Sequence, residues 1–424
     1  MKSKFLVLLL VGLFAAALFA GCGPADDDNG DDVVGDYEVH TIVGLFPLTG
    51  VLSTFGENSA EVARLAAADV NEWLEENDRD WRLRLEIDDT QTEGPVGLRK
   101  FQSWYGEGVM FFAGPQASGV AGELLSFANA NQILYISPSS TSPALSIADD
   151  WLFRFCTTDE VQGPAIAAAA NEAGVEVMIW GWRGDTWGDG LQGAAEQSAV
   201  EFGIEVYPQK LRYDPIKEDF TTDVALLDEY VTDLVEQGYE LGQIGFNLIA
   251  FEEAAPLMAE AAGYPQLREL VWVGSDGTAF SEAILQHPVA GPFAIDVKFV
   301  NPMNRPAELV EQSNYERVRD YIQETLARET DAYSYNTYDI VWVLAMCIDE
   351  VGYDPVAVKE ILPRVTEEWT SVYGASGQIV LNEFGDRAFA DYDLVLLTED
   401  LEWEIPGYFD GAARKIIWLN GSIY

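Results

Sequence analysis

Short apolar runs alternate with stretches of helical spacing along most of the chain. Residues 39–45 form the first run rich in β-formers, and residues 59–75 then repeat their apolar positions at intervals close to one helical turn. Residues 82–87, 109–114 and 133–137 are the next predicted strands. Strands that alternate with helices in this way favour an α/β protein with parallel sheets.

A second series of the same kind begins near Thr157. It comprises predicted strands at residues 175–180, 204–207, 244–250 and 270–274, and predicted helices at residues 166–173, 190–202, 222–237 and 254–262. Each series has the length of a domain, so we expect two similar α/β lobes. The sequence has no repeat with a period of about 20–50 residues, which excludes a solenoid.

The composition is that of a folded chain with an extreme negative charge. Apolar residues make up 48% of the 424 residues, enough for two or three packed domains at roughly 100–200 residues each. The chain has 71 Asp and Glu against 24 Lys and Arg, for a formal net charge of −47. Nucleic-acid binding is excluded, because it needs basic residues to neutralise phosphates. Acids spread along the chain favour a salt-loving source over a merely acidic surface.

Few residues could support catalysis or metal binding. The chain has two histidines, His40 and His287, and three cysteines, Cys22, Cys156 and Cys347. These cannot form a CxxC pair, an HExxH helix or a His–Cys metal cluster. The sequence also lacks a GxSxG elbow and a GxxxxGK[ST] phosphate loop. We therefore expect no enzyme activity, no metal and no cofactor, and we leave open whether Cys156 and Cys347 form a disulfide or stay free.

The first residues predict export and a lipid anchor. Lys2 and Lys4 precede an uncharged, largely apolar run over residues 5–20. Such a run with small residues at its end is typical of a signal peptide, here residues 1–21. Residues 18–22, LFAGC, resemble the lipobox of lipoproteins, so we expect a lipid on Cys22 and an acidic tether over residues 22–36. The protein would then lie on the extracytoplasmic face of the cell membrane. A transmembrane anchor is the alternative, but the run is short for a span of about 20 residues.

Seven stretches of the mature chain resemble one known family. In order, they are GLFPLTG at 44–50, GPQASG at 114–119, ISPSSTSPAL at 136–145, DTWGDG at 185–190, GSDG at 274–277, YD at 338–339, and GASG at 374–377 followed by FGDR at 384–387. Each is a weak signal by itself, because Gly and Ser are common in turns. Together and in this order they resemble the branched-chain amino acid binding proteins of ABC importers, which have the type I periplasmic-binding fold.

This resemblance implies how the chain is divided and how it works. It places three crossings between the lobes near Thr158, Val297 and Tyr373. One lobe would then consist of residues 37–157 plus 298–372, and the other of residues 158–297 plus 373–424. Proteins of this family close their lobes over a ligand by a hinge motion, and an ABC permease recognises the closed form.

Three hydroxyl residues are candidates for binding a carboxylate. Ser118, Ser139 and Thr141 each follow a predicted strand, where hydroxyls and backbone N–H groups are both available. From the residues alone, ordinary capping explains them as well. By the resemblance, the hydroxyls of Ser118 and Thr141 hold the ligand carboxylate, and Ser139 makes a backbone contact.

The remaining candidates are one acid and three aromatic residues. By the resemblance, Asp276 binds the ligand ammonium, and Phe55, Trp187 and Phe251 form the walls around its side chain. The family often has Tyr where this chain has Phe55 and Trp187. A more apolar cavity suits an aliphatic or aromatic amino acid, or a small amide. The alternatives are therefore a binding protein for amides or urea-like solutes, a sensory ligand-binding component and, least consistent with the residues, an extracellular enzyme.

Overall fold

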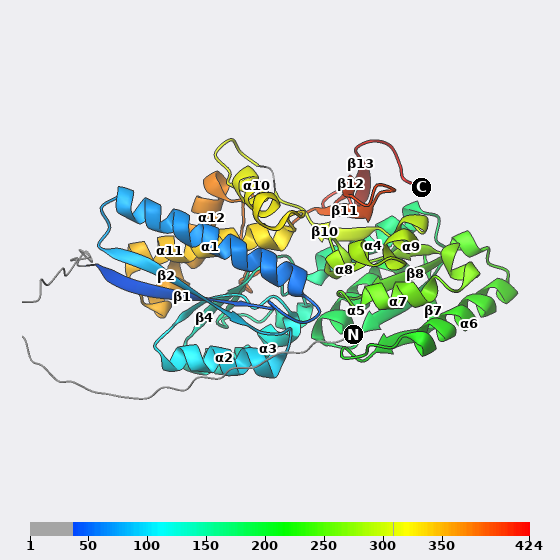
Figure 1. Cartoon of the computed structure of the whole chain (residues 1–424), viewed down its shortest axis with the longest axis horizontal. Coiled ribbons are helices and arrows are strands. Elements are labelled where there is room, and N and C mark those ends of the chain that lie inside the picture. Colours follow the sequence, from blue (N-terminus) through cyan, green and yellow to red (C-terminus); the bar gives the residue numbers. More distant parts are fainter. Residues whose placement is uncertain (1–36, 308) are drawn as a thin grey trace, which may run out of the picture. The chain divides into compact units, whose positions relative to one another are not determined.

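The computed structural model describes residues 37–307 and 309–424 (Figure 1). The predicted signal peptide, the acidic tether and Cys22 lie outside the described residues. No helix in the described part is both long and apolar enough to cross a membrane. Cys156 and Cys347 are buried as free thiols.

The first lobe is built on a five-stranded parallel sheet in the order β2-β1-β3-β4-β5. Its strands are β1 (Glu38–Phe46), β2 (Trp81–Asp89), β3 (Phe111–Ala113), β4 (Leu134–Ser137) and β5 (Leu152–Arg154). Its helices are α1 (Ser53–Glu76), α2 (Gly94–Gly106), α3 (Ser118–Asn131), α10 (Tyr315–Leu326), α11 (Ala332–Val351) and α12 (Pro355–Tyr373). Helices α1 and α11 lie on one side of the sheet, and α2 and α3 on the other (Figure 1).

Burial explains why these segments fold as they do. Strand β1 is buried without a break from Thr41 to Phe46, as expected for a parallel strand covered by helices on both faces. Helix α11 is the central helix of the lobe, because 16 of its 20 residues are buried. Helix α1 packs against α11, and its buried residues include the small side chains of Ala60, Ala63 and Ala67.

The second lobe contains a four-stranded parallel sheet in the order β7-β6-β8-β9. The strands are β6 (Val177–Arg183), β7 (Glu205–Tyr213), β8 (Ile244–Ile249) and β9 (Val271–Val273). The helices are α4 (Asp159–Glu172), α5 (Thr186–Glu201), α6 (Thr221–Gln237), α7 (Ala254–Ala261), α8 (Glu282–Gln286) and α9 (Ala290–Asp296). The predicted α/β fold with two lobes and parallel sheets is confirmed.

A third sheet, which is antiparallel, extends the second lobe. It has the order β10-β11-β12-β13, with β10 (Asn301–Asn304), β11 (Tyr392–Leu397), β12 (Trp403–Asp410) and β13 (Lys415–Trp418). A bridge between Val273 and Val300 connects it to β9. This sheet is not apparent from the sequence, because β10 meets β11 only after the chain has passed through the first lobe.

The chain crosses between the lobes three times, after β5, after β10 and after α12. The third passage contacts both of the others: Arg154 at the end of β5 bridges Asp386, and the Arg305 amide donates to the carbonyl of Asp391 (2.8 Å). The three passages therefore form one connected hinge. The residue ranges given for the lobes from the sequence stay a prediction.

Candidate functional site

A cavity of about 20 Å³ lies where loops of both lobes meet. Its lining residues come from the carboxyl ends of parallel strands and from the starts of α1 and α11, the region where ligands bind in α/β sheets. They are Leu52, Phe55, Gln116, Ala117, Ser118, Ser139, Trp187, Phe251, Asp276, Gly277 and Tyr333. Six of the seven residues predicted for the site are among them. The seventh, Thr141, is buried two positions beyond Ser139 but does not line the cavity.

The predicted hydroxyl residues shape the floor on the side of the first lobe. Ser118 begins helix α3, and its Oγ accepts a hydrogen bond from the Ser142 amide (3.2 Å). The Ser139 hydroxyl donates to the carbonyl of Gln116 (3.1 Å). These contacts fix the loop after β4 against the start of α3. The free N–H groups in the first turn of α3 are therefore available beside the two serines.

Asp276 is the acid of the cavity. It follows β9 in a short turn and is almost fully buried, and the hydroxyl of Tyr333 from the first lobe donates a hydrogen bond to its Oδ2. Its Oδ1 accepts no well-formed hydrogen bond. Burial raises the pKa of this carboxyl above its usual value. The turn is rigid, because the Thr278 hydroxyl donates to Asn301 Oδ1 (2.6 Å) on β10.

A second buried carboxyl, Asp159, stands near Asp276 and was missed in the sequence analysis. It is the first residue of helix α4, and neither of its carboxyl oxygens accepts a well-formed hydrogen bond. Burial, and then the charge of Asp276, raise the pKa of Asp159 well above its usual value. The only sequence signal was an acid in the first turn of a helix, a common position for Asp.

The cavity region therefore offers acceptors and lacks a fixed cation. Among the described residues that line it there is no Lys or Arg. Buried acceptors without partners are costly, and a ligand group that carries several N–H donors and a positive charge relieves that cost. The arrangement is suited to an ammonium group.

Aromatic rings form another part of the cavity wall. Trp187 and Phe251 are stacked with ring centroids 4.5 Å apart and an interplanar angle of 16°. Phe55 meets Tyr333 edge-on at 6.0 Å. Gly277 permits the close approach of this wall, because a Cβ there would lie 2.7 Å from ring atoms of both Trp187 and Phe251. The wall is suited to an apolar side chain.

Arg183 supports the aromatic wall through its contact with the ring of Phe251. Its guanidinium lies 4.0 Å from the ring centroid of Phe251 and donates to both Asp185 and Glu253 at 2.6 Å. The Tyr213 hydroxyl donates to the same Glu253 (3.0 Å). Because the arginine is almost fully buried and paired twice, it acts as a fixed support.

Arg154 connects the loop after β4 to the hinge. It is completely buried, and its Nη1 donates to the carbonyls of Ser140 (2.7 Å) and Ser142 (2.8 Å). Its Nε and Nη2 form a bidentate pair with Asp386 at 2.5 and 2.7 Å. The motif that contains Asp386 is visible in the sequence, but its pairing with Arg154 is not, because 232 positions separate the two residues.

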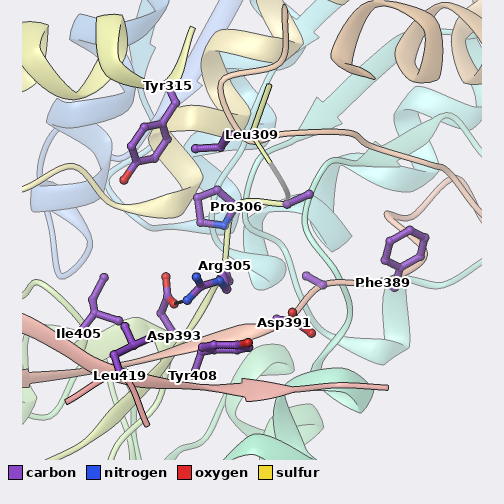
Figure 2. Close-up of a pocket in the computed structure, with 12 residues that line it drawn as sticks. Arg305, Pro306, Leu309, Tyr315, Phe389, Asp391, Asp393, Ile405, Tyr408 and Leu419 are labelled. Atoms are coloured by element: carbon purple, nitrogen blue, oxygen red, sulfur yellow. Dashed lines mark hydrogen bonds and ion pairs between the residues drawn. The ribbon is translucent and has the colours of Figure 1, made fainter. Parts of the chain in front are cut away.

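A larger pocket of about 680 Å³ lies at the hinge and contains none of the predicted site residues (Figure 2). Arg305 is paired with Asp393 there and lies 4.2 Å from the ring centroid of Tyr408. Phe389 and Leu419 are largely exposed. Among the described residues that line this pocket, none has a buried polar side-chain atom without a hydrogen-bond partner, which distinguishes it from the inter-lobe cavity.

Comparison with known proteins gives relatives along nearly the whole chain. An uncharacterized protein of Methanocaldococcus jannaschii is 29% identical over 422 residues, covering 96% of this chain and 98% of that protein. A Leu/Ile/Val-binding protein homolog of Brucella melitensis is 23% identical over 364 residues, covering 84% and 90%. The crystal structure of a branched-chain amino acid transporter substrate-binding protein from Streptococcus pneumoniae in complex with isoleucine has a TM-score of 0.71 at 17% identity, covering 90% and 100%.

The fold is the two-lobed type I periplasmic-binding-protein fold, and proteins of this kind bind substrates without transforming them. Residues 58–400 match the family described as the receptor family ligand binding region. That match covers well over half of the sequence. The chain belongs to this family of ligand-binding proteins.

Proposed function

We propose that this protein is the solute-binding protein of an ABC importer and captures an apolar α-amino acid of the branched-chain type between its lobes. The observation that carries the proposal is Asp276, a buried carboxyl whose Oδ1 accepts no well-formed hydrogen bond and which lines the same inter-lobe cavity as the aromatic residues. The names of the Brucella and Streptococcus relatives support the ligand class.

Each part of an amino acid has a partner in this arrangement. The ammonium is assigned to Asp276, with Asp159 as the second carboxyl nearby. The carboxylate is assigned to the start of α3 with Ser118 and to the loop of Ser139 and Thr141. The side chain is assigned to the wall of Phe55, Trp187 and Phe251. In the present arrangement the cavity is smaller than a leucine, so the lobes must separate about the hinge for a leucine to enter, and the cavity walls must move outward for it to fit.

We base the proposed cellular location on the predicted signal peptide, residues 1–21. A lipid on Cys22 and the acidic tether of residues 22–36 would hold the protein at the extracytoplasmic face of the membrane, beside the permease. A single lipid chain anchors a protein only weakly, so we expect the protein to carry a second lipid chain. Fractionation tests this: the full chain should pellet with membranes, and Cys22→Ser should move it to the soluble fraction. A wild-type protein in the soluble fraction contradicts the anchor.

Binding is tested by calorimetry and thermal shift against leucine, isoleucine, valine, phenylalanine, acetamide and urea. A ligand that binds the native state raises the melting temperature according to its concentration relative to Kd. We expect shifts with the branched-chain amino acids, and at least about tenfold weaker binding in Asp276→Asn. Asp150→Asn, a buried carboxyl that does not line the cavity, is the matched control.

The other outcomes of the screen are equally decisive. Shifts with acetamide or urea alone would assign the protein to amide-type solutes, for which a protonated Asp276 could donate a hydrogen bond to a carbonyl. No shift with any of the six compounds would remove the amino-acid assignment while leaving the fold unchanged.

We also propose that the acidic surface is an adaptation to high salt. A formal charge of −47 makes the folded chain repel itself, and salt screens that repulsion within a few ångströms. The melting temperature should therefore rise when salt is raised from about 0.1 M to about 2 M. A melting temperature that stays level or falls contradicts the adaptation.

A further inference from the structure

Glu252, in the loop between β8 and α7 of the second lobe, contacts the start of helix α1 in the first lobe. The Thr54 hydroxyl donates to its Oε1, and the Thr54 amide approaches the same oxygen at 3.4 Å. The Ser53 hydroxyl donates to Oε2 at 3.4 Å. In the opposite direction, the Glu252 amide donates to the carbonyl of Val51 (3.2 Å). Four hydrogen bonds thus join two segments from different lobes.

Helix α1 needs this partner because it lacks a cap of its own. Its N-cap residue is Leu52, whose side chain cannot accept a hydrogen bond, and its first turn contains no acid. The first N–H groups of a helix have no partner within the helix, and a carboxylate there satisfies them and complements the helix dipole. With 24 residues, α1 carries the full macrodipole. Glu252 supplies from the other lobe what the helix sequence omits.

The contact lies directly behind the cavity walls but outside the cavity. Glu252 follows Phe251, and Thr54 precedes Phe55, so joining them brings these two aromatic residues together across the lobe interface. Glu252 does not line this cavity, but it lines a smaller one of about 10 Å³ next to it, which also includes Phe55 and Gly277. Other contacts that cross the interface include those from Tyr333 to Asp276, from the Ser142 hydroxyl to the carbonyl of Thr186 (2.8 Å) and from the Asp159 amide to the carbonyl of Thr141 (2.9 Å). Among the acceptors of these contacts, only the Glu252 carboxylate caps a helix.

We propose that Glu252 is a positioning residue that holds the lobes closed by capping helix α1 of the opposite lobe, and that it thereby slows release of the bound solute. When the lobes separate, the cap is lost and the carboxylate returns to water. The contact therefore stabilises only the closed form. The measurement of solute release rests on the proposed function. The measurement of lobe closure does not depend on that function.

The test compares Glu252→Ala with the wild-type full chain, with Glu236→Ala as the control. Glu236 is exposed on α6 of the second lobe, so Glu236→Ala removes the same charge at a position away from the interface. Stopped-flow measures leucine dissociation, small-angle scattering measures the radius of gyration without ligand, and thermal unfolding is followed with and without leucine.

We expect leucine to leave Glu252→Ala about tenfold faster, the effect of losing one hydrogen bond to a charged group. The melting temperature should fall more in the leucine-bound protein than in the ligand-free protein, because only the closed fraction of the ligand-free molecules makes the contact. Thr54→Val removes the donor from the other lobe and should give the same result. The double variant should be no worse than either single variant.

Two results overturn the inference. If leucine dissociates at the wild-type rate while the ligand-free melting temperature falls, Glu252 is only a helix cap. If leucine binds neither protein, the proposed function fails, and scattering alone decides: a larger ligand-free radius of gyration in Glu252→Ala supports the inference, and an unchanged radius overturns it.

Discussion

The hydroxyl of Tyr333 on helix α11 donates a hydrogen bond to the carboxyl of Asp276 beyond β9, joining the two lobes through the wall of the cavity. Both side chains are almost fully buried. Tyr333 thus donates to one oxygen of the carboxyl, and the other oxygen accepts no well-formed hydrogen bond. The same pair orients the acid of the proposed ammonium site and contributes to lobe closure.

Tyr333→Phe should weaken leucine binding by about tenfold, because the carboxyl of Asp276 loses a donor and one contact between the lobes. Isothermal calorimetry measures this change. Tyr135→Phe is the matched control, since its hydroxyl donates to the carbonyl of Ala121 (3.0 Å) within the first lobe. The control should lower the melting temperature and leave Kd unchanged. Equal affinity in Tyr333→Phe and wild type would contradict this role.

Gly277→Ala should weaken binding and destabilise the closed form, by about 1–3 kcal/mol, because its Cβ would press on Trp187, on Phe251 and, at 2.6 Å, on the Ala250 carbonyl. Calorimetry gives the affinity, and near-ultraviolet circular dichroism follows the stacked rings. Gly193→Ala on helix α5 is the control: nothing lies within 4 Å of its Cβ, so it should stabilise the helix by up to about 1 kcal/mol. An unchanged dichroism spectrum in Gly277→Ala would count against the packing argument.

Arg154→Met should destabilise the protein by about 3–5 kcal/mol, because it leaves the carboxylate of Asp386 buried without its partner. It should also weaken ligand binding, since the loop carrying Ser140 and Ser142 loses its support. Denaturant unfolding measures the stability. Adding Asp386→Asn removes the uncompensated charge, so the double variant should be more stable than Arg154→Met alone. A double variant that is less stable would contradict this account.

Asp150 should make stability fall as pH rises. Burial raises its pKa in the folded protein to about 7, whereas in the unfolded chain it stays near the ordinary value of 3.8. Between these values the folded protein holds one more proton than the unfolded chain, so raising the pH favours unfolding. Asp150→Asn should therefore gain about 2 kcal/mol relative to wild type between about pH 4 and pH 8, after allowance for solvent screening.

Unfolding at several pH values checks this prediction. Asp149→Asn, next to it on the surface, is the control and should differ from wild type by the same amount at every pH. A constant difference between Asp150→Asn and wild type would show that Asp150 is not the titrating group.

The sequence alone determined the local elements, because each leaves a signal within a few residues. The buried run of β1 and the helical spacing of α1 identify those elements, with α1 beginning six residues earlier than residue 59. The motifs that carry Ser118, Trp187 and Asp276 also follow strands. Because the carboxyl ends of parallel strands lie at one edge of each sheet, the parallel topology predicts that these motifs meet at the lobe interface.

Only the tertiary structure decided which distant residues complete the site. Tyr333 and Asp276 are 57 positions apart, and Thr54 and Glu252 are 198 apart, on different lobes. Nothing in the local pattern around Asp159 separates an orphan carboxyl near the cavity from an ordinary acid in a first helical turn. Such contacts depend on how three hinge passages set one lobe against the other. The relative placement of the lobes arises from packing between distant segments. The periodicity of a single segment contains no information about such packing.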